Sequence, residues 1–307
     1  MKILEPSFEI QDDLDQKSLV VRLEACGRIC YKSEELISED SAMPFVRKVA
    51  GHGHNSVLEM AVVTLKVKCS RSEIDAFLAC QPKYFVVDEY DGGLLLTASI
   101  RGFREIYQRF PDNTVVTETV GFLADRHPYL FEGIWKTSDG ERRGSLEVEK
   151  MPLTAVEALP DRLLLRHRFV GVTLYVNRAV THEIVRHRPC SYLQESQRYC
   201  RYSQDKFDNQ VTFIKPMFYE EGSAEYDLWK KAMEETEAIY LKLLETSTPQ
   251  AARTVLPNSC KTEIIVYCNL EEWKHIFTLR THKTAEPSMR EIMIPLAEEL
   301  ASRYRVF

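Results

Sequence analysis

The segment 186–201 (RHRPCSYLQESQRYCR) concentrates side chains that bind anionic ligands. Its arginines and His187 alternate with serine and glutamine residues. Arginine presents a planar set of donors that fits phosphate and the edge of a planar heterocycle, and Ser and Gln add neutral donors and acceptors. The segment therefore indicates a nucleotide pocket. On spacing alone a solvated basic loop is an equal alternative, because exposed arginines are common and contribute little.

Two histidine patterns suggest a metal site, and neither has a suitable ligand set. His182 and His187 imitate the HExxH pattern of zinc proteases but lie five residues apart. On a helix that spacing turns the two rings about 140° away from each other, so they cannot share one ion. His52 and His54 form an HxH pair without evident partner ligands. We therefore predict no bound metal.

Other classes of chemistry lack their sequence patterns. Tyrosines interleave with arginines between 192 and 202, as in proteins that bind single-stranded nucleic acid, but the formal net charge of −6 disfavours a long polyanion. Cys190 and Ser191 follow a histidine closely, yet no flanking glycines form a nucleophile elbow. Neither GxGxxG nor a P-loop pattern occurs, so a dinucleotide would not be held in a Rossmann manner.

The composition indicates a chain of 307 residues with a sizeable core and no membrane segment. The eight cysteines form no CxxC pair, and no stretch has eighteen consecutive apolar residues. The amino terminus has no basic region followed by an apolar run, so we expect no signal peptide. These features predict a cytoplasmic protein with reduced thiols that binds neither nucleic acid nor a membrane.

Hydrophobic spacing predicts the elements that position these residues. Helices are expected at 15–32, 41–50, 70–80, 177–188, 223–247, 270–281 and 287–303. Strands are expected at 61–69, 169–176 and 261–268, with a hairpin over 85–98 that turns at Asp91-Gly92-Gly93. Ser56 is a candidate cap of a short helix, and 189–203 reads as a loop. Thr248 and Pro249 predict the start of a helix that carries Arg253. The positive end of this helix would strengthen a phosphate site.

The order of elements indicates the α+β class, because helices dominate and the few strands do not alternate with them. We expect one domain over 1–307 with an insertion at about 71–165. Within it, 111–165 has no clear periodicity and carries four prolines and the charged run SDGERRGSLEVEK, so exposed loops are expected there.

The RHR motif and its surroundings resemble the signature of the flavin-dependent thymidylate synthases. That signature is RHR, a seven-residue spacer and Ser, then Arg-Tyr, and it corresponds here to Arg186-His187-Arg188, Ser196 and Arg198-Tyr199. The segments HGHNSVLEM (52–60), AARTVLP (251–257) and CNLEEWKHIFTLR (268–280) resemble other blocks of the family. The resemblance covers roughly 15–70 and 165–305.

The resemblance implies a homotetramer that methylates dUMP to dTMP, with FAD and dUMP bound where subunits meet. Methylenetetrahydrofolate would supply the carbon and NADPH would reduce the flavin, without a cysteine nucleophile. A non-catalytic nucleotide-binding or RNA-binding relative of the same fold is the alternative.

The family pattern also implies roles for individual residues. The residues expected to contact FAD are Ser56, Arg186, His187, Arg188, Gln194, Asn269 and His275. Those expected to contact dUMP are Glu183, Arg186, Gln194, Glu195, Ser196, Gln197, Arg198, Arg253 and Arg280, with Arg198 and Arg253 on the phosphate. Arg280 is the expected catalytic residue beside the pyrimidine, where a fixed cation would stabilise negative charge after deprotonation at N3.

Two positions depart from the family pattern. Leu193-Gln194 replaces the common Asn-Glu, so a neutral amide stands where the family has a carboxylate. Glu271 stands where many relatives carry an arginine beside FAD.

Overall fold

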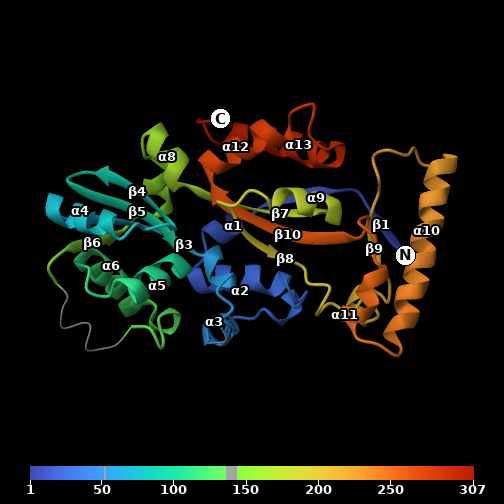
Figure 1. The fold of residues 1–307 in the computed structure, drawn as a ribbon, viewed down its shortest axis with the longest axis horizontal. Helices are drawn as coiled ribbons and strands as arrows, with labels where there is room; N and C mark the ends of the chain where they lie inside the picture. Colours follow the sequence, from blue (N-terminus) through green and yellow to red (C-terminus); the bar gives the residue numbers. More distant parts are fainter. Residues whose placement is uncertain (52, 136–143) are drawn as a thin grey trace.

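The computed structural model describes residues 1–51, 53–135 and 144–307 (Figure 1). Strands in the described residues form a two-stranded sheet and two four-stranded sheets, with helices packed around them. The prediction of an α+β fold is confirmed. Within the described residues, every helix is either too short or too polar to cross a membrane.

The central sheet has the strand order β2-β7-β10-β8 and is antiparallel throughout. Its strands are β2 (Ser7–Ile10), β7 (Phe169–Asn177), β10 (Lys261–Asn269) and β8 (Ser191–Gln194). The long pair β7–β10 runs in register from Lys261 opposite Asn177 to Asn269 opposite Phe169. This sheet connects two sequence segments of the predicted site, because β8 lies within 186–201 and β10 ends where 268–280 begins.

Each face of the central sheet supports a separate core. Val172, Leu174 and Val266 pack with the C-terminal helices α12 (Leu270–Arg280) and α13 (Pro287–Arg303), whereas Ile265 and Tyr267 pack on the opposite face. Helix α2 (Leu19–Ile29) covers that second face (Figure 1). Because both faces are covered, β10 is apolar along most of its length.

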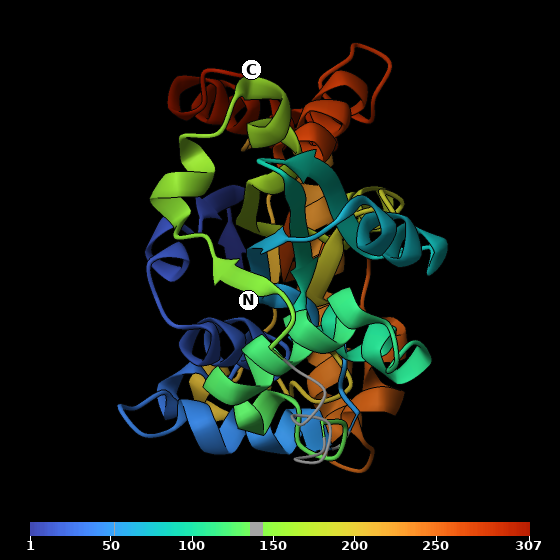
Figure 2. The same ribbon diagram turned by 90° about the vertical axis from the view of Figure 1, so that its left-hand side faces the viewer.

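The second four-stranded sheet has the order β4-β5-β3-β6. Figure 2 views the molecule from the end at which this sheet lies. The sheet comprises β3 (Val62–Lys68), β4 (Phe85–Tyr90), β5 (Gly93–Ser99) and β6 (Glu147–Lys150), with α4 (Arg71–Ala79) and α5 (Ile100–Arg109) beside it. Asp91 and Gly92 both have positive φ, which is the geometry of a two-residue type I′ hairpin. The predicted hairpin is therefore confirmed.

The expectation of exposed loops over 111–165 is wrong for most of the described part. Helix α6 (Thr114–Arg126) has ten buried residues, and α7 (Leu153–Glu157) and α8 (Asp161–His167) follow β6. Val116 and Leu123 join the same core as Leu23 of α2. The α6 sequence is apolar on several sides, so it shows no clear one-sided periodicity. Part of the charged run lies in 136–143, outside the described residues.

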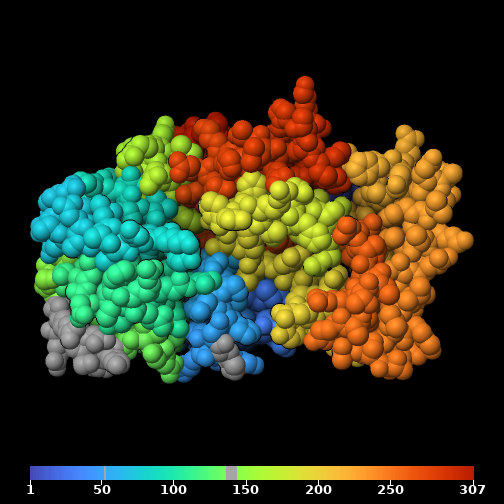
Figure 3. All heavy atoms as spheres, viewed as in Figure 1, coloured from blue at the N-terminus to red at the C-terminus, as the bar shows by residue number. Residues whose placement is uncertain are grey.

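The two-stranded sheet and the long helix beside it lie at the end of the molecule opposite the second four-stranded sheet (Figures 1 and 3). Strands β1 (Lys2–Leu4) and β9 (Thr212–Ile214) pair in parallel beside the long helix α10 (Ala224–Leu244). Thr248 accepts a hydrogen bond from Ala251 N and caps α11 (Pro249–Ala252), as predicted. Arg253 is the C-terminal cap of this four-residue helix, so the predicted help from a positive helix end is wrong.

Two helices predicted near the amino terminus are found with different bounds. The helix predicted at 15–32 is the shorter α2, which begins after the cap Ser18, and a separate helix α1 (Asp12–Asp15) precedes it. The helix predicted at 41–50 is α3 (Ala42–Gly51). Ser56 precedes a 3-10 turn (Val57–Met60) but makes no side-chain capping bond.

Candidate active site

The RHR motif lies in a loop rather than on the helix predicted over 177–188. Helix α9 (Arg178–Ile184) starts at Asn177, whose side chain accepts from Val180 N, and it ends before the motif. The hydroxyl of Tyr192 donates to the carbonyls of Ile184 at 2.7 Å and His187 at 2.9 Å. We call residues 185–190 the RHR loop. Tyr192 belongs to β8, so the segment 189–203, predicted as a loop, contains a strand. This strand anchors the RHR loop.

Anchoring of the RHR loop sorts its side chains between core and solvent. His187 is buried, whereas Arg186 and Arg188 are exposed. The exposed arginines thus flank an inward-facing imidazole. Such an arrangement can bind an anionic group outside while the histidine contacts residues of the protein.

Helix α12 supplies the opposite wall of the site. The side chain of Asn269 caps this helix by accepting from Glu272 N at 2.9 Å, and its amide donates to the carbonyl of Arg166 at 2.9 Å. Trp273 and Ile276 are buried, so Glu272 and His275, three residues apart, lie on the side toward the RHR loop. Both polar atoms of the Asn269 side chain thus make hydrogen bonds within the chain, and its expected FAD contact stays a prediction.

Arg280 joins the two walls. Its Nε donates to His187 Nε2 at 3.0 Å, its Nη1 to the Glu183 carboxylate at 2.8 Å, and its Nη2 to the Glu183 carbonyl at 2.9 Å. Its ion-pair partner is therefore Glu183. The side chain is only 15% exposed, and these three contacts hold the guanidinium in one orientation. A cation held this way costs little reorganisation when negative charge develops beside it.

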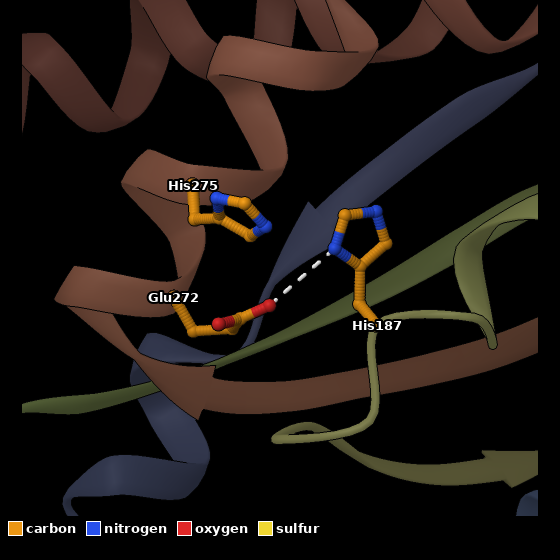
Figure 4. A group of neighbouring side chains, drawn as sticks. All are labelled: His187, Glu272 and His275. Carbon is orange, nitrogen blue, oxygen red and sulfur yellow. Dashed lines mark ion pairs between the residues drawn. The ribbon is translucent and has the colours of Figure 1, made fainter.

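His187, Glu272 and His275 meet at the centre of this region (Figure 4). Glu272 Oε1 lies 3.4 Å from His187 Nδ1, and the two imidazole rings meet edge to face at 5.8 Å. Burial and then the positive charge of Arg280 lower the pKa of His187 to about 4, so the ring is neutral at pH 7. Burial raises the pKa of Glu272. Within the described residues Glu272 Oε1 makes no hydrogen bond although it is buried.

The same three residues place ligand atoms within 4.8 Å of one another, a spacing that a divalent cation can use. Arg280 opposes this use, because it donates to the ring nitrogen that must itself carry a proton if Nδ1 binds a metal. Arg186 and Arg188 add further positive charge nearby. The charge pattern suits an anionic ligand better than a cation.

A cavity of about 640 Å³ opens between the RHR loop and α12. The residues that line it are Arg186, His187, Arg188, Pro189, Glu272, His275, Leu279, Arg280, Thr284 and Ala285. The wall combines three arginines with two histidines and an apolar edge. The predicted residues Arg186, His187, Arg188, His275 and Arg280 are thus brought together.

Residues 194–198 lead away from this cavity. Gln194 donates to Thr181 Oγ1 at 3.2 Å and to Thr262 Oγ1 at 3.1 Å. The carboxylate of Glu195 accepts from the Tyr202 hydroxyl at 2.8 Å and from Lys261 Nζ at 3.1 Å. Both side chains are therefore engaged within the chain, and their expected ligand contacts stay predictions.

The three residues after Glu195 differ in how far they are engaged. Ser196 N donates to the carbonyl of Cys30, and Ser196 Oγ accepts from Arg198 N at 3.3 Å. Gln197 is buried, and its Nε2 has no hydrogen-bond partner among the described residues. The Arg198 side chain is exposed above the ring of Tyr199.

The predicted phosphate ligands lie apart from Arg280 within one chain. Helix α11, which precedes the exposed Arg253, lies at the lower right of Figure 1, whereas helix α12, which carries Arg280, lies at the top centre. Ser56 is exposed at the start of the 3-10 turn and belongs to neither group. The neighbouring His52 of the HxH pair lies outside the described residues.

One member of the site was missed from the sequence. Glu272 lies three residues before His275 on α12, so helical spacing alone places both on one side. The run Glu271-Glu272 looks like ordinary acidic residues of a first helical turn. The contact with His187, which the tertiary structure shows, identifies Glu272 and not Glu271 as a member of the site.

Comparisons with known proteins identify the family of this chain. The family model described as thymidylate synthase complementing protein matches residues 16–78 and 164–304. A flavin-dependent thymidylate synthase of Pyrococcus furiosus is 35% identical over 173 residues, 56% of this chain and 70% of the relative. One of Pyrococcus abyssi is 38% identical over 171 residues, 55% of this chain and 69% of the relative.

A solved structure is also similar to this chain. The UMP/dUMP methylase PolB of Streptomyces cacaoi, bound with 5-Br dUMP, matches with a TM-score of 0.42 and 14% identity, covering 100% of this chain and 94% of that one. The family model and the sequence relatives carry the assignment. The chain belongs to the family of thymidylate synthase complementing proteins, the flavin-dependent thymidylate synthases.

Proposed function

We propose that this chain is an FAD-dependent enzyme that methylates dUMP to dTMP, with methylenetetrahydrofolate as carbon donor and NADPH as reductant. Family membership supports the reaction class. The observation that carries the proposal is the Arg280 guanidinium, oriented by Glu183 and His187 on the wall of the 640 Å³ cavity. A fixed cation there stabilises negative charge on a pyrimidine.

The residues around the cavity fit a flavin nucleotide. Arg186 and Arg188 are exposed donors suited to its phosphates, and the buried acceptor Glu272 Oε1 lacks a donor among the described residues. The bound flavin would supply the hydride for the methylation. His187 and His275 would lie against its ring system, while Arg280 would hold the uracil edge.

We also propose that the site is completed between subunits of a homotetramer. The support is the separation of Arg253 from Arg280 and the exposure of Arg198. A phosphate held by Arg198 and Arg253 can approach Arg280 only if another copy contributes one of the two groups. Mixing the inactive variants R198A and R280A would then restore activity through mixed oligomers. No recovery after mixing and refolding would contradict a shared site.

The segment from about 71 to 165 is proposed to be an insertion within a single domain. The family model leaves residues 79–163 unmatched, and the buried residues of α6 share a core with α2. The eight free cysteines suit the cytoplasm as the working compartment.

The test is the visible absorption spectrum of the purified protein, followed by an assay for dTMP. A yellow protein that converts dUMP with NADPH and methylenetetrahydrofolate is expected. A colourless protein that stays inactive with added FAD would show that the proposal is wrong.

A further inference from the structure

Four residues at the cavity edge form one line of contacts: Glu272, His187, Arg280 and Glu183. Glu272 Oε1 faces His187 Nδ1 at 3.4 Å, and Arg280 Nε donates to His187 Nε2 at 3.0 Å. The Glu183 carboxylate and carbonyl then accept from the two Nη atoms of Arg280. Both ends of the line are acidic residues, and its middle is the expected catalytic cation.

The line of contacts defines the tautomer of His187. Arginine has donors and no acceptor, so the Nε2 that faces it must be the unprotonated nitrogen. The proton of a neutral ring is then on Nδ1, the nitrogen that lies 3.4 Å from Glu272 Oε1. That oxygen is buried and makes no hydrogen bond with the described residues, so the carboxylate acts on the Nδ1 proton through its charge.

We propose that Glu272 is a positioning residue that acts on Arg280 through His187. Its carboxylate favours the proton on Nδ1, which keeps Nε2 available to accept from Arg280 and so holds the guanidinium in its orientation. The inference rests on the proposed function, in which Arg280 contacts the pyrimidine. A carboxylate that orients a histidine, which in turn orients the working group, is a recurrent arrangement in enzymes.

The surrounding groups explain why an oxygen is needed at this place. His187 faces Arg280 and His275 from α12 and lies between Arg186 and Arg188 of its own loop, while Glu183 is occupied by Arg280. Glu272 is thus the acidic group among the described residues that faces the Nδ1 side. The negative end of its side chain increases the capacity of Nε2 to accept a hydrogen bond from Arg280.

A metal ion is the competing use of the same atoms. Binding of a metal at Nδ1 would move the ring proton to Nε2, where it would oppose the N–H of Arg280. The hydrogen bond to Arg280 at 3.0 Å therefore favours the positioning role.

The experiment compares E272L, E272Q and the control E298Q, which changes an exposed glutamate on α13. We expect E272L to lower kcat about tenfold while the KM for dUMP changes less than about threefold, the scale of losing the hydrogen bond from Arg280 Nε to His187 Nε2. E272Q should stay within about threefold of the parent, because the amide oxygen keeps a partial negative charge beside Nδ1. E298Q should match the parent protein. Equal damage from E272L and E272Q would overturn the inference.

A double-mutant cycle separates positioning from general damage to the fold. If Glu272 acts through Arg280, adding E272L to R280A should lower kcat by less than about twofold. A full additional tenfold loss would show an independent role and overturn the inference. Thermal midpoints and flavin spectra of all variants identify any that fail to fold.

Two further measurements do not depend on turnover. In a crystal structure of E272L, Arg280 Nε should no longer contact His187 Nε2; an unchanged contact would overturn the inference. Calorimetric titration with zinc should show no stoichiometric binding, and binding lost in E272L would favour the metal instead. If the parent protein makes no dTMP, the proposed function fails while these two results still decide the role of Glu272.

Discussion

Two buried histidines, His167 and His187, have similar acidities and different surroundings. Burial lowers the pKa of each to about 4. His167 uses both ring nitrogens, with Thr97 Oγ1 at 2.8 Å from Nδ1 and Asp88 Oδ2 at 3.1 Å from Nε2. His187 uses Nε2 for Arg280, and its Nδ1 faces an oxygen without a hydrogen bond.

The two regions also differ in access. The ring of His167 is fully buried between α8 and the second sheet, and Asp88 is shared with Arg162 and Arg166. His187 lies on the wall of a cavity. A saturated polar cluster in a closed interior stabilises a fold, whereas an incompletely satisfied one beside a cavity can receive a ligand. A depressed histidine pKa therefore does not identify an active site unless an open partner position accompanies it.

Removing Asp88 should produce the largest effect. D88A would leave His167 and Arg166 without their shared acceptor, and loss of one partner from a buried ion pair costs about 3 to 5 kcal/mol. Urea denaturation should show a destabilisation of this size. The control is E89Q, at the exposed pair with Arg71, which should cost less than about 0.5 kcal/mol. Similar losses from both variants would remove the structural half of the comparison.

Removing Arg280 should affect rate more than stability. R280A is expected to lower kcat about 100-fold, with a much smaller change in dUMP affinity, because the lost cation acts on charge that develops during the reaction. Steady-state kinetics and calorimetric binding measure the two quantities. R162A is the matched control, since Arg162 also pairs with a carboxylate but is 73% exposed. An R280A variant that turns over normally would remove Arg280 from the mechanism.

Acid should destabilise the protein through His167. The pKa is about 4 in the folded state and 6.5 in the unfolded state, so the unfolded chain takes up the proton first as pH falls. The stabilisation is complete above pH 6.5 and is lost progressively toward pH 4, by about 2 kcal/mol at pH 5. His187 changes in the same direction. Denaturation at several pH values gives the free energy of unfolding as a function of pH, and this free energy should depend less on pH in H167Q. An unchanged pH dependence would exclude His167 as the source.

The smallest effect is expected at Thr97. T97V would keep the shape of the side chain but remove the hydroxyl that contacts His167 Nδ1 and Thr64, at a cost of about 1 to 2 kcal/mol. T97S should recover most of the loss. Thermal unfolding monitors both variants, and activity should be unaffected in the folded protein. A loss of turnover in folded T97V would mean that this cluster communicates with the site.

Much of the local structure could be predicted from the sequence. The strand at 261–269, the helices after it and the hairpin at Asp91-Gly92 follow from β-branched runs, capping residues and turn chemistry. The end of α9 was misplaced because Arg186 to Arg188 do not disfavour a helix by themselves. The bonds from Tyr192 to two carbonyls accompany the turn of the chain there.

The sequence by itself determined the chemical inventory of this protein: the RHR signature, the later arginines and the helix that carries Glu272 and His275. Tertiary structure alone decided which of these groups meet. Spacing along a helix reports direction over a few turns, whereas the distance between residues 187 and 272 depends on how the RHR loop packs against α12. Arg280 thus became a partner of Glu183 and His187 through packing that a local pattern does not encode.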